Sequence, residues 1–243
     1  MFFYFLLSLQ AFFPSEEKIL VLENKIKKAA VSTQDKVIYW HLHEPFPYLG
    51  VGRFIWFPKN SSFDYQEDFP LLLKFIKDKG HPLPDWIDDN FTCPWASRQE
   101  FENDQKRQAE LRVVLESTFH LQIKFLISYS FETFEKIIQN TEELHRSCMR
   151  SKISALLSDS RGLYALIDYA QFKGSGLNEK EFKLGKGYGL KQVLEAMPED
   201  GASVEMFVKT AKDVLKERAK LSNGHDEKWL ASWINRLDRY RNF

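Results

Sequence analysis

Hydrophobic and polar residues alternate with a helical period through most of this chain. Apolar residues that recur every three or four positions place one face of each segment in a core, so the segments are expected to be helices. The predicted helices cover 15–30, 69–78, a long region that starts at 97, 130–138, 141–157, 163–169, 190–197, 203–221 and 226–241. Two starts carry capping signals, since Ser15 precedes two glutamates and Ser97 with Glu100 fits a capping box.

One stretch departs from the helical pattern. Residues 44–58 have the sequence EPFPYLGVGRFIWFP. Gly50 and Gly52 permit a positive φ or a close backbone approach, and the run from Arg53 to Phe57 favours a strand. Together with the β-prone run Val37–Trp40, this stretch predicts a small β element. The expected fold class is therefore α+β and mostly α-helical.

The first 13 residues are almost wholly apolar. Met1–Phe13 has the length of a signal-peptide core and is too short to span a bilayer. Ser8–Ala11 offers a small-residue cleavage site, although the positively charged start is missing. The segment predicts a signal peptide, with a buried first helix as the alternative. Residues 14–243 are then expected to form a single domain without an integral membrane span, exported to the periplasm or medium, or cytoplasmic if no signal is present.

Charge and cysteine content exclude several classes of protein. Lys plus Arg and Asp plus Glu number 34 each, and no long basic block provides the phosphate attraction of a nucleic-acid partner. Cys93 and Cys148 are too few for a four-cysteine zinc site or a disulfide framework, so they pair once or are buried thiols. His41 and His43 lack a third ligand. Neither a metal nor another cofactor is expected.

The stretch at 44–58 combines the ingredients of a sugar-binding cleft, which are a carboxylate, a glycine hairpin and an aromatic wall. Glycoside hydrolysis needs two carboxyl groups, or one acid and a positioned water. Glu44 is one candidate, and Asp35 and Asp64 lie on either side of it in the sequence, with nothing in the spacing to select the partner. An ordinary hairpin with one buried face is the alternative interpretation.

Several motifs in this chain resemble known proteins. Leu49-Gly-Val-Gly-Arg53 resembles the Gly-Ile-Gly-His hairpin of phage-type lysozymes. Four parts of the chain resemble more closely an uncharacterised family of exported bacterial proteins related to that fold. They are the motifs of 44–58, Cys93-Pro-Trp-x-x-Arg98, Gly162–Tyr169 with Phe172–Gly174, and Gly187–Leu194. The resemblance implies a lysozyme-like helical domain with one small β-hairpin, and a function on cell-wall glycan.

Two positions depart from the family pattern. In the family a general-acid Glu ends the first helix within Trp-x-Asn-Glu. An ungapped alignment from Trp40 and Glu44 puts Ala29 at that position, and Arg53 replaces the hairpin histidine. Alanine donates no proton, and general acid–base catalysis contributes roughly 10²–10⁴-fold. The resemblance therefore implies glycan binding with weak or lost hydrolysis, unless another carboxylate serves as the acid.

The resulting hypothesis names candidate acids and a candidate cleft lining. The candidate catalytic residues are Glu44, Asp35 and Glu23. The candidate substrate-binding residues are Trp40, Tyr48, Gly50, Gly52, Arg53, Trp56, Lys173, Tyr188 and Gln192. The expected partner is cell-wall glycan (peptidoglycan), or a protein if the fold serves a non-catalytic structural or interaction domain. A different enzyme class built around Lys173, Tyr188 and Gln192 is a third hypothesis.

Overall fold

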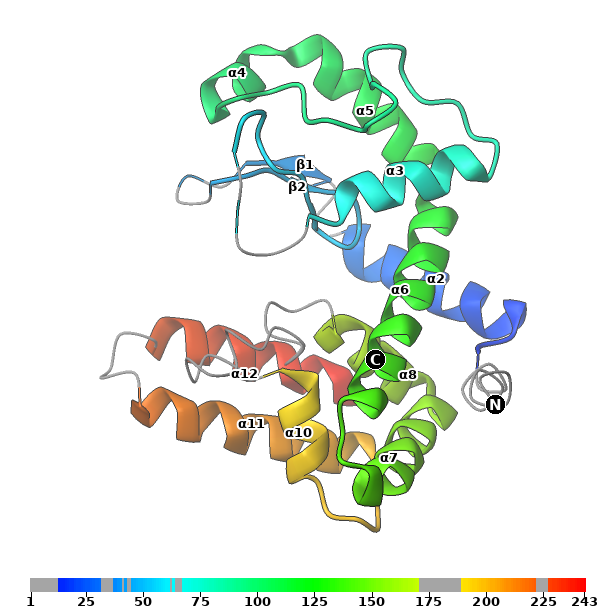
Figure 1. Ribbon diagram of the computed structural model, residues 1–243, viewed down its shortest axis with the longest axis vertical. Coiled ribbons are helices and arrows are strands. Elements are labelled where there is room, and N and C mark those ends of the chain that lie inside the picture. Colours follow the sequence, from blue (N-terminus) through cyan, green and yellow to red (C-terminus); the bar gives the residue numbers. More distant parts are fainter. Residues whose placement is uncertain are drawn as a thin grey trace. The chain divides into compact units, whose positions relative to one another are not determined.

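The computed structural model describes residues 13–31, 37–40, 42, 45–61, 63, 67–170, 189–221 and 227–243. Its helices are α2 (Glu16–Val31), α3 (Phe69–Asp78), α4 (Arg98–Asn103), α5 (Gln105–Ser117), α6 (Phe119–Gln139), the 3₁₀ helix η2 (Glu143–His145), α7 (Arg146–Ser158), α8 (Ser160–Ala170), α10 (Leu190–Ala196), α11 (Val204–Leu221) and α12 (Glu227–Arg241). Its strands are β1 (Ile38–Tyr39), β2 (Tyr48–Leu49) and β3 (Phe54–Ile55) (Figure 1). The predicted class, α+β and mostly α-helical, is confirmed.

The chain forms two compact units. We call Glu23–Leu126 the sheet unit, and Met1–Leu22 with Ile127–Phe243 the helical unit. The boundaries fall inside α2 and inside α6, so each of these helices contributes residues to both units. The single domain predicted over 14–243 stays a prediction, because two contact units can belong to one domain.

The sheet is antiparallel, in the order β1-β2-β3. Its register forms two rows of residues. Tyr39 lies opposite Tyr48, which lies opposite Ile55; Ile38, Leu49 and Phe54 form the other row. Successive residues of a strand point to opposite faces, so each row belongs to one face of the sheet.

Ser97 and Ser15 cap their helices as predicted, although Glu100 accepts the N–H of Ala96 and not that of Ser97 as a capping box requires. The Glu100 N–H donates to Ser97 Oγ at 3.2 Å, and Glu100 Oε2 accepts the Ala96 N–H at 2.8 Å. Ser15 Oγ accepts the Lys18 N–H at 3.3 Å. Both caps satisfy donors that a helix start leaves unpaired.

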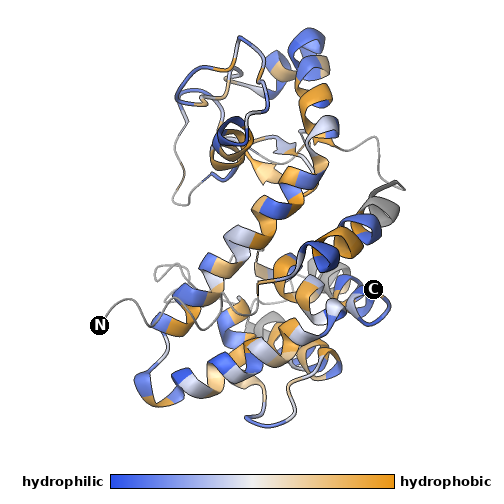
Figure 2. Ribbon diagram, turned by 90° about the vertical axis from the view of Figure 1, so that its right-hand side faces the viewer, coloured by the Kyte–Doolittle hydropathy of each residue, from blue (hydrophilic) through white to orange (hydrophobic). Residues whose placement is uncertain are grey.

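The boundary predicted inside α6 is wrong. The pattern predicted a new helix at Ser130, but α6 continues through it without a break. The polar residues there are accommodated within the helix, since Thr133 Oγ1 donates to the Tyr129 carbonyl one turn earlier at 3.1 Å. Hydrophobic and hydrophilic residues are interspersed along the helices, α6 included, as Figure 2 shows.

The core of the sheet unit is aromatic. Trp56 and Trp95 are buried edge to face with ring centroids 5.8 Å apart, and Trp56 lies 4.8 Å from Phe69 of α3. The Trp56 indole N–H donates to the Phe91 carbonyl at 2.8 Å. The irregular loop that contains Phe91 and Trp95 is thereby fastened to the sheet, since buried indole nitrogens require an acceptor.

Polar contacts fasten the last helix within the helical unit. Asp168 of α8 accepts hydrogen bonds from Arg236 Nε and Tyr240 Oη of α12, both at 2.6 Å, and a further bond from Arg236 Nη2. Tyr240 is fully buried, and burial raises its pKa well above the ordinary value.

Lys152, also buried, donates to the carbonyls of Leu194 and Met197 at the end of α10.

Two further observations bear on the predictions. Among the described residues, no helix has both the length and the apolar composition that crossing a membrane requires.

Cys93 and Cys148 are both free thiols, and burial raises the pKa of Cys93 to about 12. The predicted signal segment lies outside the described residues, except for Phe13.

We predict that Asp168→Asn lowers the free energy of unfolding by about 2 kcal/mol, because it leaves a partly desolvated guanidinium with weaker acceptors. Glu102→Gln is the matched control, since Glu102 pairs with Arg98 at the surface of α4 and such pairs contribute under about 1 kcal/mol. Urea denaturation of both variants measures the difference. Equal losses would contradict a special role of Asp168.

Candidate functional site

The pleat of the sheet separates its residues into two faces. Ile38, Trp40, Leu49, Phe54 and Trp56 are buried on one face. The alternate residues Tyr39, Tyr48, Ile55 and Phe57 are half-buried on the other. The strands therefore place tryptophan inside and tyrosine outside, as the two-residue period requires.

The half-buried face carries a continuous aromatic cluster. We call Tyr39, Tyr48, Phe57 and Phe63 the aromatic face. The rings of Tyr39 and Tyr48 stack across the two strands with centroids 5.5 Å apart, and those of Phe57 and Phe63 lie 4.6 Å apart. Fully buried Phe46 lies against Tyr48, Phe57 and Phe63 at 5.5, 6.1 and 5.6 Å and supports them from within.

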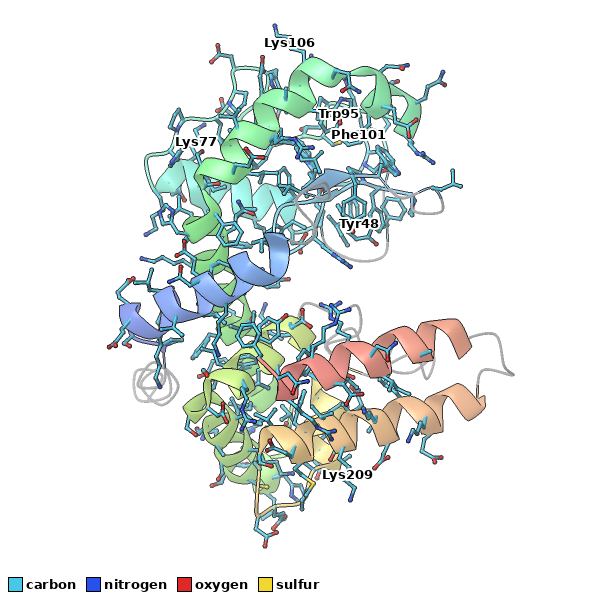
Figure 3. All side chains as sticks on the ribbon, turned by 180° about the vertical axis from the view of Figure 1, so that it is seen from behind. Tyr48, Lys77, Trp95, Phe101, Lys106 and Lys209 are labelled. Carbon is cyan, nitrogen blue, oxygen red and sulfur yellow. The ribbon has the colours of Figure 1, made fainter. Side chains whose placement is uncertain are left out.

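Figure 3 shows the same division among labelled residues, with Trp95 and Phe101 on one side of the sheet and Tyr48 on the other. Two predicted lining residues belong to the buried side. Trp56 is 0% exposed and Trp40 is 8% exposed. In this structure both tryptophans therefore support the sheet, whereas Tyr48 is accessible in part.

A tight turn of four residues joins β2 to β3. Gly50 has φ +68° and Arg53 has φ +53°, and the Arg53 N–H donates to the Gly50 carbonyl at 3.2 Å. Left-handed backbone costs an ordinary residue about 1 kcal/mol relative to glycine. Arg53 adopts this unfavourable backbone conformation, and its side chain is exposed.

Gln122, a buried residue of α6, holds this turn in place. Its Oε1 accepts the Val51 N–H at 3.0 Å, and its Nε2 donates to the Leu115 carbonyl of α5 at 2.5 Å. A Cβ on Gly50 would lie 2.5 Å from Oε1, and one on Gly52 would lie 2.7 Å from the Phe54 ring. Both predicted glycines therefore permit close approach, which fixes the turn on its helix.

Two carboxyl groups cover the outer edge of β3. Asp68 Oδ1 accepts the Ile55 N–H at 2.5 Å, and Glu67 Oε2 accepts the Phe57 N–H at 2.7 Å. Desolvation raises the pKa of Asp68 to about 7, against the backbone hydrogen bonds that lower it. Desolvation also raises the pKa of Glu67. Exposed edge strands invite pairing with other chains, and these side chains block that pairing.

Of the candidate acids, the structure describes Glu23 alone. Glu23 lies in α2 and is 8% exposed, so its carboxyl is directed into the protein. Glu44 and Asp35 lie outside the described residues. Ala29, which the resemblance aligns with a general acid, belongs to the last turn of α2, which ends at Val31. The helix thus ends where the resemblance expects a general acid, and the residue there is alanine.

Of the remaining predicted residues, the structure describes Gln192 alone. Lys173 and Tyr188 lie outside the described residues. Gln192 belongs to α10 of the helical unit, and its amide atoms are buried with no hydrogen-bond partner among the described residues. No group of three His, Cys, Asp or Glu side chains in the described part of the chain is arranged to hold a metal.

Comparisons of this chain with protein-family models, with curated proteins and with solved structures find no match.

The sequence pattern did not identify Tyr39, Phe57 and Phe63 as surface residues, or Gln122 and Asp68 as supports. The alternation of Phe54-Ile-Trp-Phe57 was the available signal for Phe57, since it assigns Trp56 and Phe57 to opposite faces. No local sequence pattern indicates that Gln122 supports the turn, because its partner Val51 lies 71 residues away in the chain.

We expect Gln122→Ala to lower the free energy of unfolding by about 1–3 kcal/mol, because the Val51 N–H and the Leu115 carbonyl lose their partner. Hydrogen exchange of the Val51 amide should accelerate well beyond the change in global stability. Gln108→Ala is the control, since its amide donates to the Phe101 carbonyl away from the turn. If Val51 exchanged equally fast in both variants, Gln122 would not hold the turn.

The Asp68 carboxyl predicts a pH-dependent stability. Between the ordinary pKa of 3.8 and about 7 the folded protein binds a proton at Asp68 that the unfolded chain has released. Stability therefore falls as pH rises through this window, by up to about 1.4 kcal/mol per unit. Asp68→Asn keeps an acceptor for Ile55 and removes the charge, so unfolding titrations from pH 4 to 7 should show a flatter profile. An unchanged slope would refute this assignment.

Proposed function

We propose that this protein is a lysozyme-like protein that binds the glycan of the cell wall, peptidoglycan, through the aromatic face, and that it hydrolyses this glycan weakly or not at all. The proposal includes export to the periplasm or medium, which rests on the apolar segment Met1–Phe13. The observation that carries it is the half-buried stacked pair of Tyr39 and Tyr48 beside a turn fixed by Gln122.

Aromatic rings suit a sugar ligand for a physical reason. One face of a pyranose ring carries mostly C–H groups and packs on an aromatic surface, while its hydroxyls need polar partners at the edge. Tyrosine supplies both, because it has an apolar ring and a hydroxyl. A rigid surface also lowers the entropy lost on binding, and the buried Phe46 gives the aromatic face such support.

We expect weak hydrolysis because of where the candidate carboxylates lie along the chain. A glycosidase needs an acid that reaches the leaving oxygen. The last turn of α2 carries Ala29 at the position where the family has that acid, and Glu23 of the same helix is directed into the protein. Glu44 and Asp35 stay candidates for residual activity.

A second candidate function is a non-catalytic protein-interaction domain that reuses the fold. Complete burial of Trp56 and near-complete burial of Trp95 favour it, because these rings then act as core and not as a cleft lining. Tyrosine, phenylalanine and arginine are also common at protein interfaces.

The test is binding of the full chain to insoluble peptidoglycan, with released muropeptides measured in the same tube. We expect retention of the protein with little or no release. Tyr48→Ala should weaken retention about tenfold, which corresponds to about 1.4 kcal/mol, and Tyr39→Ala should act in the same direction. Tyr129→Ala is the matched control, since this half-buried tyrosine belongs to the helical unit.

The other outcomes separate the alternatives. Release that disappears in Glu44→Gln would identify an active glycosidase with a displaced acid. Absence of both retention and release would refute the glycan proposal and favour the interaction domain. If Tyr48→Ala and Tyr129→Ala weakened retention on peptidoglycan equally, glycan binding would not take place at the aromatic face.

A further inference from the structure

Arg53 occupies a backbone conformation that its residue type does not favour. Its φ of +53° is in the left-handed region, where glycine and asparagine are the common residues. Strained positions that persist are concentrated at ligand-binding sites. The chain places a long cationic side chain at such a position, and this side chain is exposed.

The guanidinium of Arg53 has no partner within the described part of the chain. None of the ion pairs or side-chain hydrogen bonds there includes it, whereas Arg107, Arg161 and Arg236 all pair with carboxylates. An arginine presents five donors in a fixed planar arrangement that matches a carboxylate. Within the described residues, Arg53 therefore has no carboxylate partner, and its backbone is in the left-handed region.

The turn gives this group a fixed place beside the aromatic face. Arg53 precedes Ile55 of the Tyr39–Tyr48–Ile55 row by two residues, so the two Cα atoms lie about 7 Å apart along the strand. Gln122 holds Val51 of the same turn, and Gly50 accepts the Arg53 N–H. The backbone of Arg53 is therefore held next to the end of this row, in a turn that Gln122 fixes.

We propose that Arg53 binds carboxylates of the glycan, so that this surface selects an acidic, carboxylate-bearing glycan over a neutral one. The inference rests on the proposed function and adds the chemical class of the ligand. A ligand with a sugar ring next to a carboxylate satisfies both parts of the surface. The rings pack on the sugar, and the guanidinium forms a charge-assisted, bidentate hydrogen bond with the carboxylate.

The experiment compares three insoluble probes with the full chain: peptidoglycan, the same peptidoglycan with its carboxyl groups amidated, and chitin as a neutral glycan. The proteins are the wild type, Arg53→Asn and Lys106→Gln. Asparagine tolerates the left-handed backbone and removes the charge. Lys106 is an exposed cation of α5 and serves as the matched control.

We expect native peptidoglycan to bind the wild type about five- to tenfold more tightly than the amidated form or chitin. Arg53→Asn should bind all three probes at the weaker level, and its binding should depend less on salt. Lys106→Gln should behave as the wild type. Thermal unfolding of both variants checks that the fold is retained.

Two results would overturn the inference while leaving the proposed function in place. One is equal binding of the wild type to native and amidated peptidoglycan. The other is undiminished binding of Arg53→Asn to native peptidoglycan while Tyr48→Ala still reduces it. If the wild type binds none of the three probes, the inference and the proposed function both fail.

Discussion

The alternation of side chains along three short strands determines which residues of the sheet unit face the core and which face outward. Because successive residues face opposite sides, Trp56 must lie in the core once Ile55 and Phe57 lie at the surface. The same constraint brings Tyr39 and Tyr48 together across the strands. A register shift of one residue would exchange the faces and expose the tryptophans. The aromatic face thus exists only in the observed register.

The supports of this register come from distant parts of the chain. Gln122 of α6 holds the β2–β3 turn, and the carboxyl groups of Glu67 and Asp68 bond the free edge of β3. Strands of two residues make few ladder hydrogen bonds of their own. The side chains of neighbouring elements provide the bonds that the short ladder lacks, and Gln122 thereby fixes the turn that contains Arg53.

The sequence predicted the helices well, because their apolar periodicity is long and repeated. The range Phe69–Asp78 agrees at both ends, and the Ser97 cap forms as expected. Some limits differ. Polar residues at Ser130 suggested a boundary that the packed interior of α6 overrides. The long region from 97 is divided into α4, α5 and α6, and the helix predicted from 141 begins at Arg146 after the 3₁₀ helix η2. Local pattern therefore gave the elements but not every limit between them.

The candidate site was harder to predict for a physical reason. The stretch at 44–58 was correctly seen as the β element, but aromatic content does not reveal which residues face outward. Trp40 and Trp56 were grouped with Tyr48, although the pleat separates them. Gln122 depends on a contact across 71 residues, which no local pattern contains.

The central claim is that a glycan contacts the aromatic face, and nuclear magnetic resonance tests it most directly. Isotope-labelled protein would be titrated with soluble peptidoglycan fragments. We expect the amide signals of Tyr39, Tyr48 and Ile55 to shift, while the signal of the buried Trp56 indole N–H, which donates to Phe91, stays in place. Shifts confined to the helical unit, or no shifts at saturating ligand, would show that the glycan does not contact the aromatic face.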